Sequence, residues 1–244
     1  LTGGKLVTEG EGSPCIYSTG DISATDVVGV AYGSEIAVVE GKNSIALERA
    51  DLTGRERNGV MLYQSFSGDA DVGTAKFSAK DSKLTNESGG AMFYATNTKA
   101  EITLEATALS SPDAQPLLRA AADRWGQSGK NGGDVTLTAT RQTLNGDVCA
   151  DNLSAVTLNL CDGSRWTGAL NAEATAKSAS VRLAKTATWT MTADAHVDAI
   201  ADEAADFSNI DSNGFSIYYN KEKNPALNGS AYPLPGDGTL APQE

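Results

Sequence analysis

A three-position pattern recurs along this 244-residue chain and limits the folds open to it. Two apolar residues stand at i and i+2, four to six mostly polar residues follow, and a third large apolar residue comes next, with a polar residue or Gly after it. The six copies begin at Ile45, Ala75, Ile102, Val135, Leu158 and Val181, and their third positions are Leu52, Leu84, Leu109, Leu144, Trp166 and Trp189.

The alternation at i and i+2 is typical of a strand with one buried face. A strand this short cannot bury itself, but stacking the next copy on it completes both its backbone hydrogen bonds and its core. The last two steps between copies, Val135 to Leu158 and Leu158 to Val181, are each 23 residues, room for three short strands and three turns. A β-sandwich also has short strands at regular intervals, but it does not explain why Trp166 and Trp189 occupy the same position of the repeat.

We therefore predict an all-β chain that forms a right-handed parallel β-helix of roughly 9–11 coils. Residues 1–222 are expected to form this single domain. Residues 110–133 interrupt the repeat and are interpreted as an excursion from the helix wall, in which 114–125 could form about two helical turns. Residues 223–244 are rich in Pro and Gly, which is typical of a linker or a loosely held tail.

Composition and charge exclude several kinds of partner. Aromatic residues are only 6% of the chain, so Val, Leu, Ile and Ala would fill a narrow interior. The net charge of −12 repels phosphate backbones, which argues against nucleic acid as a partner, and it also opposes a polybasic membrane anchor. No apolar run approaches 18 residues, so this segment is not expected to insert into a membrane.

The sequence allows two interpretations of the cysteines. Cys15, Cys149 and Cys161 are three in number, so at least one thiol stays unpaired within the chain. Cys149 and Cys161 lie twelve residues apart and could form a local bridge, or all three could be small buried apolar residues. Because the chain has a single histidine and no Cys-x-x-Cys, no zinc site is expected.

Three segments resemble secreted right-handed β-helix proteins of gut bacteria and archaea that are described as adhesin-like. The segments are 12–20 (GSPCIYSTG), 34–45 (SEIAVVEGKNSI) and 92–104 (MFYATNTKAEITL), and the last is also similar to repeats of autotransporter passengers. The resemblance extends over most of residues 1–220. It implies a place in the secreted fraction or at the bacterial cell surface, within a larger surface protein whose β-helix is a stalk or display scaffold. It carries over no catalytic residues.

Enzymes with a parallel β-helix fold are the alternative to a binding module. Polysaccharide hydrolases need two carboxylates at a defined separation, together with a histidine-containing segment in the pectin-type enzymes. The only histidine, His196, follows Asp194 closely but has no Gly neighbour, and we interpret it as a solvated turn residue. The acidic runs at 69–71 and 202–206 lack the spacing of a calcium loop, so no cofactor is expected, with Ca²⁺ the one ion left open. Gly-x-Ser-x-Gly and a phosphate-binding Gly-rich loop are absent.

The tryptophans are the first candidates for ligand contact. Trp166 and Trp189 share a register, so they should stack on neighbouring coils about 5 Å apart. They replace leucines of other copies, which favours an interior stack; the alternative is an outward pair that forms a platform for sugar rings.

Trp125 differs because it lies in the interruption. Insertions of this kind are where binding residues are expected, so Trp125, Gln127 and Asn131 are candidate ligand-binding residues. The structural alternative is that Trp125 packs its own loop against the helix wall. Tyr63, at the end of the apolar run 60–62, is a weaker candidate of the same kind.

These observations favour a non-catalytic extracellular or cell-surface adhesin-like module, with host or polysaccharide glycans or surface proteins as partners. The first alternative is a polysaccharide lyase or glycoside hydrolase. A line of three or more carboxylates on adjacent coils inside a groove would favour that enzyme. The second alternative is a purely structural stalk segment. Uniform stacking of the coils without a groove would support it.

Overall fold

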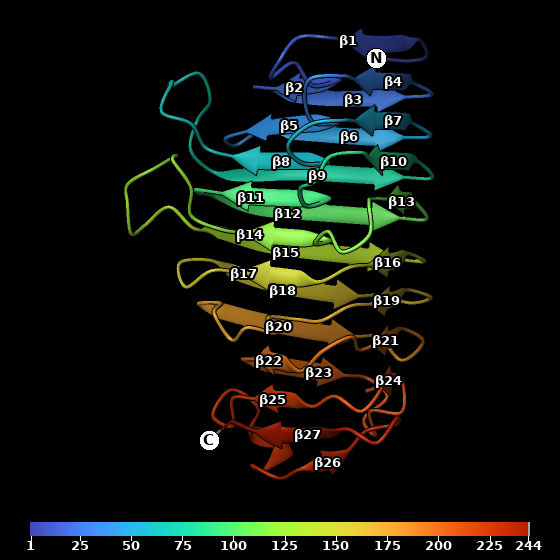
Figure 1. The fold of residues 1–244 in the computed structure, drawn as a ribbon, viewed down its shortest axis with the longest axis vertical. Coiled ribbons are helices and arrows are strands. Elements are labelled where there is room, and N and C mark those ends of the chain that lie inside the picture. The colour runs from blue at the N-terminus through green and yellow to red at the C-terminus, as the bar shows by residue number, and fades with distance from the viewer. Residues whose placement is uncertain (244) are drawn as a thin grey trace.

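A computed structural model describes residues 1–243 and shows a right-handed parallel β-helix of about ten turns (Figure 1). Parallel strands stack along the helix axis on three sides, and most coils contribute one short strand to each side. The predicted fold class is confirmed.

The sheet that we call sheet A has eight strands. They are β3 (Asp21–Thr25), β6 (Ser44–Glu48), β9 (Thr74–Lys80), β12 (Thr98–Glu105), β15 (Gly133–Thr140), β18 (Ala155–Leu160), β20 (Ser178–Leu183) and β23 (Ala199–Asp202).

Sheet B has five strands and is followed along the axis by a four-stranded sheet. The five are β1 (Lys5–Thr8), β4 (Val28–Ala31), β7 (Asp51–Gly54), β10 (Lys83–Asn86) and β13 (Ala108–Ser110); the four are β16 (Thr143–Asn145), β19 (Arg165–Thr167), β21 (Thr188–Thr190) and β24 (Ile210–Asp211).

Sheet C has six strands, and a further sheet follows it in the same way. The six are β2 (Ile16–Ser18), β5 (Ala37–Glu40), β8 (Val60–Tyr63), β11 (Phe93–Thr96), β14 (Leu118–Ala120) and β17 (Val148–Ala150); the parallel strands of the next sheet are β22 (Ala195–Val197), β25 (Ile217–Tyr219) and β27 (Thr239–Pro242).

The core consists of rows of apolar side chains, one from each coil. The third apolar positions of the predicted repeat align as expected, with Leu84 beside Leu52 and Leu109, and Trp166 beside Leu144 and Trp189. The main row in sheet A is Ile45, Phe77, Ile102, Leu137, Leu158 and Val181.

The predicted starts Ala75 and Val135 are therefore wrong by two residues. Phe77 and Leu137 are the true partners of Ile102, whereas Ala75 and Val135 align with Ala100. Because the side-chain period of a strand is two, a slip of two residues keeps every side chain on its own face. The buried face was thus predicted correctly, although the register was not.

A left-handed residue ends the turn out of sheet A in five successive coils, four times toward sheet B and the fifth time toward the four-stranded sheet that follows it. Asp26, Arg49, Asp81, Ala106 and Arg141 have φ values of 56°, 48°, 48°, 47° and 48°. Only Asp, among these types, adopts this conformation with some ease, so the turn geometry is imposed by stacking rather than by local preference.

The residue after each of these turns is buried, and in three of the five coils it is polar; Ser164, after Gly163, holds the same place in the next coil. Ser82 Oγ accepts a hydrogen bond from the Ala50 amide (3.0 Å), and Gln142 Oε1 accepts one from the Thr107 amide (2.8 Å). Thr107 and Ser164 accept the Ser82 and Gln142 amides in the same way. These side chains form a polar ladder that satisfies backbone donors inside the corner.

The predicted excursion at 110–133 contains a strand instead of helical turns. Leu118 and Ala120 of β14 face the core, and β14 lies between β11 and β17 with parallel pairing on both sides. The neighbouring strands offer backbone hydrogen-bond partners on both edges, which a helix here would leave unpaired. Two loops remain, 111–117 and 121–132.

The predicted linker or loose tail, residues 223–244, is ordered over its described part. It contains a 3-10 turn, η1 (Pro225–Leu227), and β26 (Tyr232–Pro233), which pairs antiparallel with β27. Since β27 adds to β25 in parallel and buries Leu240, this segment continues the helix and ends it with a hairpin. Residue 244 lies outside the described residues. No helix in the described chain has the length and apolarity needed to cross a membrane.

Candidate functional site

The outward face of sheet C collects aromatic side chains. One outward row runs through consecutive coils as Tyr17, Val38, Met61, Tyr94, Arg119 and Cys149. Further along the axis, His196 of β22 and Tyr218 of β25 stack with ring centroids 5.1 Å apart and an interplanar angle of 20°.

The outward face of sheet A differs from that of sheet C. Its outward positions carry Ser, Thr, Ala, Asn and charged side chains, and none of them is aromatic, since Phe77, the aromatic residue of its strands, faces the core. Four of the seven tyrosines of the chain, by comparison, lie at outward positions of sheet C and of the sheet that follows it: Tyr17, Tyr63, Tyr94 and Tyr218.

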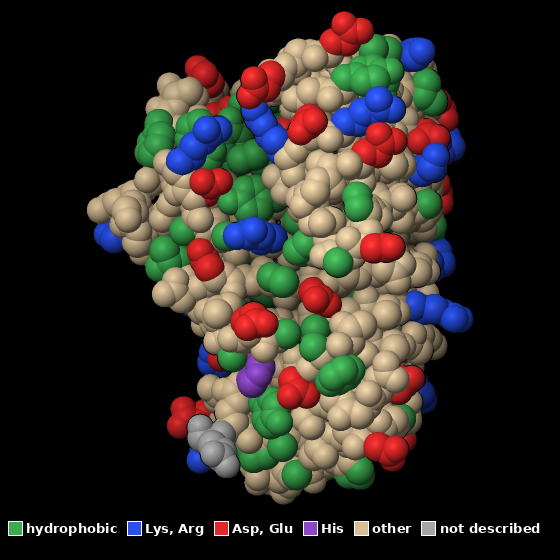
Figure 2. Space-filling view, in the orientation of Figure 1, with side chains coloured by type: hydrophobic (Ala, Val, Ile, Leu, Met, Phe, Trp, Pro, Cys, Tyr) green, Lys and Arg blue, Asp and Glu red, His purple; other side chains and the backbone are tan. Residues whose placement is uncertain are grey.

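Two loops rise beside this face and make it concave. Loop 64–73 follows β8 and loop 121–132 follows β14, and both project to the left in Figure 1. Figure 2 shows the surface hollowed between this lobe and the body of the helix, with hydrophobic side chains along the hollow.

Two recesses of sheet C adjoin one another in this hollow. One, of about 380 Å³, reaches Tyr94 and Asp123, and the other, of about 500 Å³, reaches Cys149 and Thr175. Both are lined by Pro116 and Arg119, so they form one shallow groove that follows the helix axis.

An aromatic cluster fastens the two loops to the helix wall. The Trp125 ring lies 5.1 Å from the Tyr63 ring and 5.9 Å from the Phe66 ring, both in tilted contact. The Arg124 guanidinium lies 4.8 Å from the centre of the Trp125 ring, within the range of a cation–π contact. Phe66 remains 67% exposed, so the cluster presents an apolar surface to solvent.

A buried carboxylate lies under this cluster. Glu40 is 2% exposed, and its oxygens accept hydrogen bonds from the hydroxyls of Tyr17, Tyr63, Ser65 and Ser67. No Lys or Arg nitrogen of the described chain lies within ion-pair distance of it.

The four hydroxyl donors decide the charge of Glu40. Burial raises the pKa of the Glu40 carboxyl, but the hydrogen bonds from Ser65, Tyr17, Ser67 and Tyr63 outweigh it and hold this pKa below its usual value. Burial and the bond to Glu40 in turn raise the pKa of the Tyr17 phenol. Glu40 is therefore an anion at neutral pH that orients two tyrosines and the first residues of loop 64–73.

The structure brings together two of the four candidate residues predicted from the sequence. Trp125 is half-buried against Tyr63, which is itself only 8% exposed, so the loop packs on the wall as the structural alternative predicted. The Asn131 amide donates to the backbone oxygens of Asp123 and Trp125 and shapes the loop from inside. Gln127 is exposed on the loop.

The sequence reasoning missed Tyr17, Glu40, Tyr94 and Arg119. Tyr17, Glu40 and Tyr94 stand at outward positions of strands within the segments 12–20, 34–45 and 92–104, and Arg119 stands at an outward position within the interruption 110–133. Aligning the sheet C strands of successive coils places Tyr17, Tyr94 and Arg119 in one row and Glu40 beside Tyr63 in the next.

The predicted interior tryptophan stack is confirmed. The rings of Trp166 and Trp189 are buried, and each indole N–H donates to a backbone oxygen at 2.9 Å, of Gly146 and Gly168 respectively. The outward platform for sugar rings is therefore excluded for this pair.

His196 is not the solvated turn residue that we predicted. It lies within β22, half-buried, because its ring stacks on Tyr218 of the next coil. Asp194 does not face it as a partner; its carboxylate accepts the Ser216 amide at 2.8 Å.

The arrangement of acids does not match the pattern set out for the enzyme alternative. In the paired strands of residues 1–243, no outward row places carboxylates on two adjacent coils. No group of three or more His, Cys, Asp or Glu side chains with metal-binding geometry occurs in that part of the chain either.

The thiols are free. Cys149 lies in β17 of sheet C and Cys161 follows β18 of sheet A, so the local bridge between them does not form. Cys15 is unpaired as well.

Comparison with protein-family models, with curated proteins and with solved structures found no match for the chain, so its assignment rests on the fold and on the surface just described.

Proposed function

We propose that the protein is a non-catalytic, glycan-binding β-helix module of a secreted or cell-surface protein, adhesin-like in role, which holds a polysaccharide along the outer face of sheet C. The observation that carries the proposal is that outward tyrosines gather on sheet C and the sheet that follows it, with Tyr94 in the groove, whereas the outward face of sheet A has no aromatic residue.

Sugar recognition needs both kinds of group that the groove offers. Tyr94 in the groove, and Tyr218 further along the axis, provide flat apolar surface against which the apolar face of a pyranose ring can pack, and their hydroxyls are polar handles. Arg119, exposed between the two recesses, provides several hydrogen-bond donors for ring hydroxyls. Successive coils repeat these positions about every 4.8 Å, so an extended chain can make similar contacts along the axis.

The test is affinity electrophoresis of the whole chain in gels that contain pectins, host glycans or mucin. We expect at least one polysaccharide to retard the protein, and Tyr94→Ala combined with Tyr218→Ala to reduce the affinity about tenfold or more, from two lost stacking contacts. Tyr32→Ala is the matched control, because Tyr32 is 45% exposed but follows β4 of sheet B.

The Tyr94→Phe variant distinguishes the contribution of the aromatic ring from that of the hydroxyl. The Tyr94 hydroxyl donates to Asp123 at 3.0 Å, so this variant loses the contact with loop 121–132 and keeps the ring. Retardation that is equal for the wild type and the double alanine variant, or none with any glycan, would overturn the proposal. Release of new reducing ends from the retarding polysaccharide would support the enzyme instead.

A further inference from the structure

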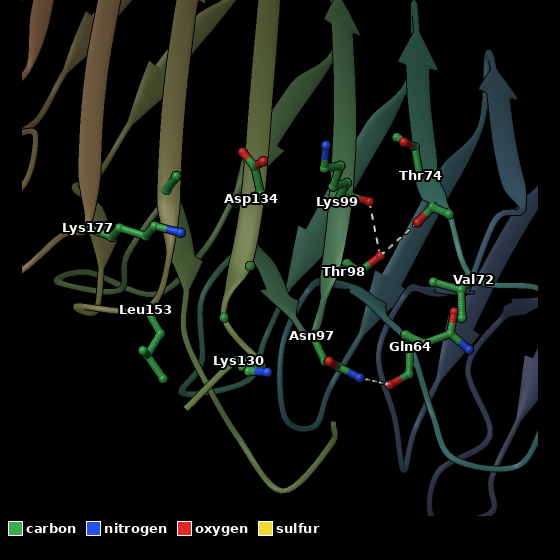
Figure 3. A pocket seen from close by; sticks show the side chains of 14 residues that line it. Gln64, Val72, Thr74, Asn97, Thr98, Lys99, Lys130, Asp134, Leu153 and Lys177 are labelled. Carbon is green, nitrogen blue, oxygen red and sulfur yellow. Dashed lines mark hydrogen bonds between the residues drawn. The ribbon is translucent and has the colours of Figure 1, made fainter. Parts of the chain in front are cut away.

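A second recess lies around the corner from the groove, on the sheet A side of the two loops. It has a volume of about 490 Å³ and opens where β9, β12 and β15 begin (Figure 3). Loop 64–73 contributes Gln64 and Val72, and loop 121–132 contributes Lys130. Loop 121–132, which contributes Asp123 to the groove, thus also forms a wall of this recess.

The recess is cationic in a protein whose net charge is −12. Lys99, Lys130 and Lys177 line it, and none has a carboxylate of the described residues within 4.0 Å. Asp134 is the only acidic residue among its lining residues. In Figure 3, Lys177 extends from its own coil toward the strand of Asp134, while Lys130 enters from the loop.

Three other lysines form ion pairs with carboxylates. Lys76, Lys80 and Lys83 each lie 3.2–3.4 Å from a carboxylate of a neighbouring coil. Lys76 and Lys80 of sheet A thus have their charge offset by the neighbouring coil, whereas the three lysines of the recess do not.

A buried acceptor adds a second feature to the recess. Gln64 is 8% exposed and its Oε1 has no hydrogen-bond partner within the described chain, although its Nε2 donates to the Ala70 oxygen at 3.2 Å. The backbone oxygen of Gln64 accepts a hydrogen bond from Asn97 at 2.8 Å, which fixes the residue in place. A buried acceptor without a donor is costly, and a ligand hydroxyl would satisfy it.

We propose that this recess binds the carboxylate of an acidic saccharide unit, with Lys130 and Lys177 facing the anion and Gln64 Oε1 accepting a ring hydroxyl. The inference rests on the proposed function, since it takes the ligand to be a saccharide and assigns it to the uronic-acid class. Ammonium groups pair with carboxylates through charge-assisted hydrogen bonds, and they carry the charge that a neutral glycan does not need.

The experiment compares three ligands by isothermal titration calorimetry on the whole chain: an oligogalacturonate, its carboxyl-reduced counterpart and inorganic phosphate. We expect the acidic oligomer to bind at least tenfold tighter than the reduced one, and this preference to weaken as salt increases. Lys130→Gln combined with Lys177→Gln should abolish the preference and leave the affinity for the reduced oligomer unchanged.

The matched control is Lys185→Gln combined with Lys221→Gln, which removes two exposed lysines outside the recess and should keep the preference. All four lysines are exposed, so equal thermal midpoints will show that folding is intact.

Equal affinity for the two oligomers, or an unchanged preference in the Lys130/Lys177 variant, would overturn this inference without affecting the proposal that the groove binds a glycan. Binding of phosphate alone would reject the saccharide ligand. If neither oligomer binds while other polysaccharides retard the protein, only this inference fails; if no glycan binds at all, the proposed function fails with it.

Discussion

Trp166 and Trp189 stack inside the helix with ring centroids 4.9 Å apart and planes only 17° from parallel. They occupy positions that leucines fill in earlier coils. Each ring is held both by its neighbour and by a hydrogen bond to a glycine oxygen one coil away.

Replacing Trp189 by Ala should lower the free energy of unfolding by about 3–5 kcal/mol, because it leaves a cavity and an unpaired Gly168 oxygen. Trp189→Leu should cost less, since it restores the residue type of the other coils. Chemical denaturation followed by far-UV circular dichroism measures both. Thr190→Ala, at the next position of the same strand, is the control. If Trp189→Ala lowered the free energy of unfolding no more than this control does, the stack would not stabilise the helix.

The polar ladder at the corner between sheets A and B predicts a cost for removing one rung. Gln142→Leu would leave both the N–H and the oxygen of Thr107 without their side-chain partner, which costs about 1–3 kcal/mol for a buried pair. Hydrogen exchange should accelerate at the Thr107 amide in particular. Thr143→Ala, at the adjacent exposed position, should change neither quantity; protection of Thr107 that survives Gln142→Leu would show that the rung is not needed.

Glu40 makes stability depend on pH with a defined sign. Its folded-state pKa is depressed, so the stabilisation it contributes is fully present above the unfolded glutamate pKa of about 4.3 and is lost as pH falls through the folded-state value. The thermal midpoint of wild type should therefore exceed that of Glu40→Gln at pH 7, and the difference should shrink in acid. Glu101→Gln, on the outward face of sheet A, is the comparison. A difference that is constant from pH 7 to pH 3 would contradict the assignment.

The thiols should be free and slow to react. Burial raises the pKa of Cys15 to about 11, and burial with the nearby Asp147 raises that of Cys149. Since the thiolate is the reactive form, alkylation of both by iodoacetamide at pH 8 should be much slower than in the unfolded chain. Mass spectrometry of the non-reduced, denatured protein should count three alkylated cysteines; only one would reveal a disulfide.

The sequence predicted the interior of this protein far better than its surface. A period of two decides which side chains face inward, and the rows from Leu52 to Trp189 followed from it. The same period does not distinguish Ala75 from Phe77 as a partner of Ile102, because both face the core. Backbone pairing on both edges made a strand of 118–120 and of 239–242, where local composition favoured an excursion and a tail.

The candidate sites were decided by tertiary structure alone. Tyr17, Tyr63 and Glu40 are 23 or more residues apart from one another along the chain, and only the stacking of coils brings their polar atoms into one hydrogen-bonded cluster. Outward side chains carry no periodic signal of burial, so nothing in the one-dimensional pattern marks them as neighbours. What the sequence by itself determined is a solenoid and its inward rows; which outward residues meet depends on the number of residues in each loop, and that was settled only when the coils stacked in register.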